Sequence, residues 1–163
     1  MSNEQSQFEL ADPDPRSFTF PCIKASQPIG DIFIASIPFK RLIMISHFDV
    51  RRVLQEERDV ERYLGIQRPL EDKRVRSLSE YVNYKDASFP TSIILAIDEE
   101  FACFDSKASE MTVSNCRIGD TKPSIHISRL AKVLDGQHRI AGLAAYSGSV
   151  FDIPVTIFFG ADI

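Results

Sequence analysis

Residues 134–143 read LDGQHRIAGL, and this stretch marks the passage of a strand into a helix. Residues 131–134 are expected to form a short strand, and Asp135 and Gly136 the turn that follows it. A helix is predicted over residues 137–147, because apolar side chains recur there at helical spacing. The side chains expected to face inward on this helix are Ile140, Leu143 and Ala144.

Such a junction suits the binding of phosphate. Free backbone N–H groups at a helix start attract anions, and Gly136 has no Cβ to obstruct their approach. His138 and Arg139 can donate hydrogen bonds to phosphate oxygens, while Asp135 can cap the helix or hold Mg²⁺ through water. On this interpretation Gly136→Val abolishes anion binding and leaves the protein folded. The alternative is an ordinary helix start with a solvated polar turn, and spacing alone leaves both open.

Short strands are also predicted on both sides of this junction. Residues 18–23, 31–37 and 41–45 are apolar or alternating runs separated by Pro and Gly turns. Residues 91–97 form a continuous apolar run and are expected to be a central strand. Residues 101–128 are interpreted as a hairpin or an elaborated sheet edge, and residues 153–159 as a closing strand.

Two further helices are predicted between these strands. Residues 46–49 (SHFD) match a capping box, helical spacing continues to Leu64, and Gly65 suits a C-terminal cap. A second helix is expected to begin at Pro69. Its buried stripe comprises Val75, Leu78, Tyr81 and Val82. The order of elements predicts one mixed α/β (α+β) domain over residues 17–163, after a flexible lead-in at residues 1–16 that is ordered only by docking.

The composition is that of an ordinary globular domain, with 163 residues, 44% hydrophobic and 26% charged. A net charge of −4 argues against a protein that coats nucleic acid non-specifically. The apolar runs are too short to span a membrane, and no signal-peptide pattern opens the chain. Cys22, Cys103 and Cys116 form no C-x-x-C pair, which predicts buried structural thiols in a reducing cytoplasm.

The pentapeptide DGQHR followed by IAGL resembles the signature of the DGQHR-domain family, which includes DndB-type proteins linked to DNA phosphorothioate modification. Upstream blocks at residues 65–70, 73–75 and 89–93 look similar to that family too, and the resemblance spans residues 33–159. It implies a cytoplasmic regulatory or accessory protein of a bacterial DNA-modification or anti-phage system, working with other proteins of that system. Family members usually continue past the last strand here, so the chain is expected to be a shortened form or a minimal member.

The family is in turn similar to the ParB/sulfiredoxin fold, in which a Gly-x-[His/Arg]-Arg turn holds nucleotide phosphates. This resemblance assigns Gly136, Gln137, His138 and Arg139 to a phosphate cradle. Sulfiredoxins carry their reactive cysteine at the Gln137 position, so peroxiredoxin repair is not expected. The resemblance also implies phosphate-binding residues in and after the block at residues 65–70, which contains Arg68-Pro69. The alternative is that these residues are exposed charges at the start of a helix. They are Gln67, Arg68 and Arg74.

The leading functional prediction is a protein that binds and hydrolyses a nucleoside triphosphate, ATP or CTP, with Mg²⁺. His138 and Asp135 would then be the catalytic residues. In the alternative, the protein is a DNA-binding transcriptional regulator. The same turn then binds DNA backbone phosphate, and no nucleotide is hydrolysed. A nuclease ranks last, because apart from Asp135 no carboxylate is placed to hold metal, and no metal site is predicted. The sequence leaves a homo-oligomer open and predicts no membrane partner.

Overall fold

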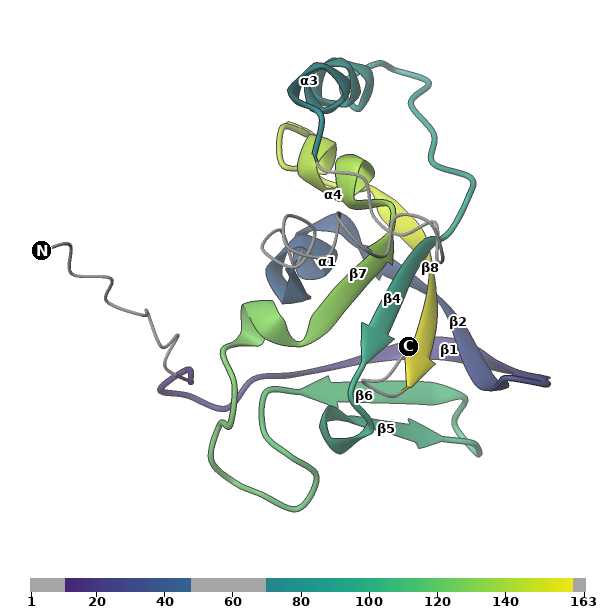
Figure 1. Cartoon of the computed structure of the whole chain (residues 1–163), viewed down its shortest axis with the longest axis vertical. Coiled ribbons are helices and arrows are strands. Elements are labelled where there is room, and N and C mark those ends of the chain that lie inside the picture. The colour runs from purple at the N-terminus through teal and green to yellow at the C-terminus, as the bar shows by residue number, and fades with distance from the viewer. Residues whose placement is uncertain (1–10, 48–69, 160–163) are drawn as a thin grey trace, which may run out of the picture.

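The computed structural model describes residues 11–47 and 70–159. Its strands are β1 (Ser17–Gln27), β2 (Gly30–Pro38), β3 (Ser46–His47), β4 (Ile93–Ile97), β5 (Ala102–Asp105), β6 (Glu110–Ser114), β7 (Ala131–Asp135) and β8 (Asp152–Phe159). The α-helices in these ranges are α1 (Phe39–Ile45), α3 (Asp72–Tyr81) and α4 (Gln137–Leu143). Short 3₁₀ turns are η1 (Glu99–Phe101) and η2 (Ile127–Arg129). Figure 1 shows α3 and α4 together at one end of the molecule and the β5–β6 hairpin at the other.

The strands form one mixed sheet in the order β3-β7-β4-β8-β2-β1-β6-β5. β4 is parallel to β8 and antiparallel to β7. Ile94 therefore pairs with Asp135, which brings the start of β4 beside the end of β7. This topology places the residues just before β4 next to the DGQHR turn, although they are more than forty positions away in sequence.

The core is built from the central strands together with helices α1 and α4. Alternate residues of the central strands face it, as the period of two in a strand requires. These fully buried side chains include Ile93, Leu95, Ile97, Ile153, Val155 and Ile157. Leu42 and Ile45 of α1 and Ile140 and Leu143 of α4 belong to the same buried cluster. Each such side chain contributes about 1.5–3 kcal/mol of burial energy, so the strand-to-helix junction rests on a well-packed base.

Most of the strands predicted from sequence are confirmed. β1, β2, β4, β7, β8 and the β5–β6 hairpin occupy the expected segments, and α3 falls within the second predicted helix. The mixed α/β class is confirmed as well. Within residues 11–47 and 70–159, no helix has the length and apolar character needed to cross a membrane.

Some local predictions are wrong. Residues 41–45 belong to helix α1 rather than to a strand, because Phe39, Leu42 and Ile45 bury one helical face. Helix α4 ends at Leu143, where tight turns replace it, and Ala144 is exposed. The expectation of buried thiols holds for Cys22 and Cys116 but fails for Cys103, which is exposed.

Some predictions fall outside the described residues. These are the first predicted helix with Asp49, Leu64 and Gly65, its neighbour Pro69, and residues 1–10 of the lead-in. Ser46 of the expected capping box lies in β3, and its hydroxyl donates a hydrogen bond to the Leu42 carbonyl at 2.5 Å.

Candidate functional site at the start of two helices

Gly136 connects β7 to α4 and needs to be glycine for two reasons. Its φ of +97° lies in the left-handed region, where a Cβ is strained. A Cβ at this position would also lie 2.9 Å from Ile93 Cγ1 and 3.0 Å from Arg139 Nη2. The N-cap of α4 is Gly136, which has no side chain, so the expectation that Asp135 caps this helix is wrong. The exposed Asp135 carboxylate instead pairs with Arg139, with Oδ2 3.5 Å from Nη2.

Arg139 ties the DGQHR turn to the chain that enters β4. Its Nη1 donates to the Thr91 carbonyl at 2.6 Å and to Thr91 Oγ1 at 2.9 Å. Its Nη2 donates to the Ser92 carbonyl at 3.1 Å. The Arg139 side chain is only 18% exposed, and this burial lowers its pKa. The charge of Arg74 lowers the pKa further, whereas the charge of Asp135 opposes both effects. The phosphate contact predicted for Arg139 would have to compete with these internal hydrogen bonds.

His138 ties α4 to α3. Its side chain is buried, and Nε2 accepts a hydrogen bond from the backbone N–H of Glu71 at 3.1 Å. Glu71 is the residue that precedes the first turn of α3. Because Nε2 acts as the acceptor, the proton of the neutral ring resides on Nδ1. The lone pair that a general base would use is therefore already engaged inside the protein.

Helices α3 and α4 pack against each other (Figure 1), and the His138–Glu71 bond joins the start of one to the start of the other. A Cβ on Gly142 would lie 2.7 Å from Leu78 Cβ and 3.2 Å from the Leu78 carbonyl carbon, so only glycine permits this spacing. Beyond the helices, Asn83 Nδ2 donates to the Ala145 carbonyl at 2.9 Å. The His138–Glu71 bond is thus one end of a continuous helix–helix contact, which makes the position of α3 dependent on the DGQHR motif.

The structure brings most of the predicted site residues together. Asp135, Gly136, His138 and Arg139 form the turn, and Arg74 of α3 is exposed and close enough for its charge to act on Arg139. Gln137 is buried at the start of α4. Gln67 and Arg68 lie outside the described residues, so their predicted role stays a prediction. Among the residues that the structure describes, no three His, Cys, Asp or Glu side chains gather as a metal site would require.

The sequence interpretation missed the partners that the motif side chains use. Thr91 and Ser92 accept from Arg139, Glu71 donates to His138, and Leu78 lies against Gly142. The blocks around residues 73–75 and 89–93 resembled the same family as DGQHR. That joint resemblance was the available signal that these segments meet in space.

We expect His138→Ala to lower the free energy of unfolding by about 1–2 kcal/mol, because the Glu71 N–H loses its acceptor. His138→Gln should recover part of this loss, since its amide oxygen can occupy the Nε2 position, whereas the shorter side chain of His138→Asn should not. Urea unfolding followed by circular dichroism measures all three variants. Equal losses in the Gln and Asn variants would contradict a role for Nε2.

A comparison of the chain with known protein families shows which family it belongs to. A family model described as DndB, DNA-sulfur modification-associated, matches residues 20–163. The chain is a member of the DndB family. Membership confirms the resemblance carried by the DGQHR motif and associates the protein with DNA-sulfur modification, together with the other components of such a system.

The DndB match runs from β1 through the C-terminal strand, so it includes the sheet, the three described helices and the DGQHR junction. Comparison with curated proteins and with solved structures finds no match for the chain. The similarity of this DndB domain to the ParB/sulfiredoxin fold therefore stays a prediction.

Proposed function

We propose that this DndB-family protein is a cytoplasmic regulatory or accessory component of a DNA-sulfur modification system that binds a nucleoside triphosphate at the α3–α4 junction. The observation that supports this most is that the charge of Arg74, exposed on α3, acts on Arg139, whose guanidinium lies beside the Gly136 turn. Two like charges that act on each other raise the energy of the ligand-free site, and a bound phosphate relieves that repulsion. The amino-terminal end of α3 adds a favourable dipole for an anion.

In this proposal the two arginines have different roles. Arg74 is exposed on the first turn of α3, so its guanidinium is available to contact phosphate oxygens. Arg139 is held by the Thr91 and Ser92 carbonyls and acts as a positioning residue for the turn. The exposed Asp135 carboxylate fits a Mg²⁺ that arrives with the triphosphate, bound through water.

Binding without rapid turnover is the form of the proposal that we favour. Hydrolysis through His138 requires a base with a free lone pair, and Nε2 accepts the Glu71 N–H. Release of that bond by ligand binding would free both the imidazole and the start of α3. If wild-type protein hydrolyses ATP or CTP, His138→Ala should lower the rate by about 10²-fold, the low end for acid–base catalysis.

Arg74→Ala should weaken triphosphate binding by about tenfold, the effect of losing one exposed hydrogen bond to a charged group. Arg76→Ala is the matched control, because Arg76 is also exposed on α3 but lies two positions further along. Isothermal titration calorimetry with ATP and CTP, with and without Mg²⁺, measures both. Equal affinities in the two variants would contradict the assignment of Arg74.

The DNA-binding alternative is tested with the same variants. A fluorescein-labelled duplex, followed by anisotropy at two salt concentrations, reports contacts to backbone phosphate through the salt dependence of affinity. Loss of duplex binding in Arg74→Ala, with no triphosphate bound by the wild type, would replace the nucleotide proposal by a DNA-backbone contact at the same turn.

A further inference from the structure

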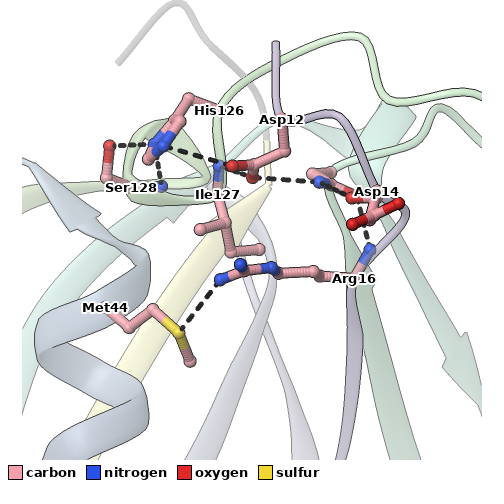
Figure 2. Close-up of polar contacts among 8 residues, drawn as sticks. Asp12, Asp14, Arg16, Met44, His126, Ile127 and Ser128 are labelled. Carbon is pink, nitrogen blue, oxygen red and sulfur yellow. Dashed lines mark hydrogen bonds and ion pairs between the residues drawn. The ribbon is translucent and has the colours of Figure 1, made fainter.

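Asp12 is a buried carboxylate that contacts no residue of the DGQHR turn, and three donors converge on it. Its Oδ2 accepts from the Ile127 backbone N–H at 2.6 Å and from Asn115 Nδ2 at 3.1 Å. Its Oδ1 lies 3.1 Å from His126 Nε2. Figure 2 shows the Asp12 side chain directed at His126 and at the backbone of Ile127. Such a set of N–H groups is a complete recognition site for a carboxylate.

The donors are held in place by their own contacts. His126 Nδ1 accepts from the Ser128 backbone N–H at 3.2 Å and lies 2.7 Å from Ser128 Oγ (Figure 2). Because Nδ1 is the acceptor, the ring proton lies on Nε2 and points at Asp12. The Asn115 backbone is likewise held from outside this segment, since its carbonyl accepts from the Ser124 N–H at 2.9 Å. The site is thus preorganised by groups other than Asp12.

The segment that carries Asp12 has little else to hold it. We call residues 12–16 the N-terminal strap. Asn115 binds it again through the Asp14 and Arg16 carbonyls, at 3.2 Å each. The other four residues, Pro13 to Arg16, are exposed, so the strap buries almost no apolar surface. Its two prolines reduce the backbone freedom lost on docking, which leaves the Asp12 carboxylate as the main anchor.

The bond between Asp12 and Ile127 attaches the strap just before β7, the strand that leads into the DGQHR motif and is called the motif strand below. Ile127 opens the η2 turn, and β7 starts at Ala131, four residues later. β7 ends at Asp135, beside Gly136. In the described residues, β3 pairs with β7 at Ala131 and Lys132, next to the η2 turn. Whatever orders η2 therefore also orders the strand that delivers the DGQHR turn.

We propose that Ile127 N–H, Asn115 and His126 form a carboxylate-binding site that the protein fills with its own Asp12, so that the N-terminal strap is a releasable clamp on the motif strand. The clamp acts whether or not a nucleotide binds at the α3–α4 junction. Release of the strap leaves the fold intact and loosens η2 and the start of β7, and a free carboxylate can take the place of Asp12.

The charges around Asp12 keep the strap docked at neutral pH. Burial raises the pKa of Asp12, but the hydrogen bonds from Ile127 and Asn115 and the interactions with His126 and Arg16 outweigh it, and the pKa lies below its ordinary value. The docked carboxylate is therefore ionised. Its contribution is present above the ordinary carboxyl pKa and is lost as the pH falls through the lowered one.

Hydrogen–deuterium exchange on the full chain tests the strap. In Asp12→Ala, the peptide covering η2 and β7 should exchange about tenfold faster, because the Ile127 amide loses its acceptor, while peptides from β2 and β8 should not change. Asp14→Ala is the matched control, since Asp14 is exposed and contacts Asn115 through its backbone carbonyl. His126→Ala, which removes one donor, should accelerate the same peptide by a smaller factor.

Chemical rescue separates a carboxylate site from a general packing effect. Sodium formate should restore slow exchange in Asp12→Ala, whereas sodium chloride at equal ionic strength should not, and neither should change the wild type. The proposal is overturned if Asp12→Ala and Asp14→Ala behave alike, if exchange rises throughout the molecule or the variant does not fold, or if formate acts no better than chloride.

Discussion

Gly136→Val is expected to lower the free energy of unfolding by about 2–6 kcal/mol. Two costs combine in this variant. A non-glycine residue at φ of +97° costs about 1–3 kcal/mol of backbone strain. A Cβ 2.9 Å from Ile93 Cγ1 and 3.0 Å from Arg139 Nη2 adds an overpacking cost of about 1–3 kcal/mol, since Ile93 is fully buried.

Gly119→Val is the control that separates the two costs. Gly119 has a similar φ of +89°, but no atom lies within 4 Å of the position its Cβ would take. Its loss should therefore be limited to backbone strain, about 1–3 kcal/mol. Urea denaturation measures both variants, and equal losses would show that the contact with Ile93 and Arg139 has no energetic weight.

This prediction revises the expectation from sequence that Gly136→Val leaves the fold untouched and removes anion binding alone. The close contact with Ile93 makes glycine a requirement of the fold, whatever else binds at the turn. Loss of phosphate binding in Gly136→Val would therefore report on both effects. Variants of exposed residues such as Arg74 are the better probes of the ligand.

Arg139→Ala is expected to lower the free energy of unfolding by about 2–4 kcal/mol. The substitution leaves the Thr91 and Ser92 carbonyls without their donors. It also removes the ion-pair partner of the Asp135 carboxylate. Arg139→Lys should recover less than half of the loss, because one ammonium group cannot reach both carbonyls in the geometry of the guanidinium fork.

The stability of Arg74→Ala provides the comparison for Arg139. Arg74 is exposed, so its removal should change the free energy of unfolding by no more than about 0.5 kcal/mol. Thermal and urea unfolding of the two alanine variants measure the difference. Similar losses in both would mean that the Thr91 and Ser92 contacts do not stabilise the turn.

Local pattern was enough to predict the elements of the junction. A β-type run, an Asp-Gly turn and a helical period are encoded within about fifteen consecutive residues, and β7, Gly136 and α4 follow them. Residues 41–45 show the limit of this approach. The run RLIMI suits a strand or a helix equally, and burial of Leu42 and Ile45 in the shared core decides for α1.

The partners of the site could not be predicted in the same way. Arg139 contacts Thr91 across 48 positions, His138 contacts Glu71 across 67, and Asp12 contacts Ile127 across 115. Such contacts depend on strand order, which no local period encodes. Residue type suggested that His138 and Arg139 face a ligand, but the topology gives both of them partners within the protein.

The central claim is that a phosphate-bearing ligand binds at the junction where α3 and α4 start, and an amide NMR titration tests it most directly. Uniformly ¹⁵N-labelled protein is titrated with ATP and with CTP, in the presence and absence of Mg²⁺. The proposal predicts saturable shifts in the amides of residues 71–76 and 136–140, and a weaker titration in Arg74→Ala. No saturable shift with either triphosphate, or shifts confined to another surface such as the β5–β6 hairpin, would contradict it.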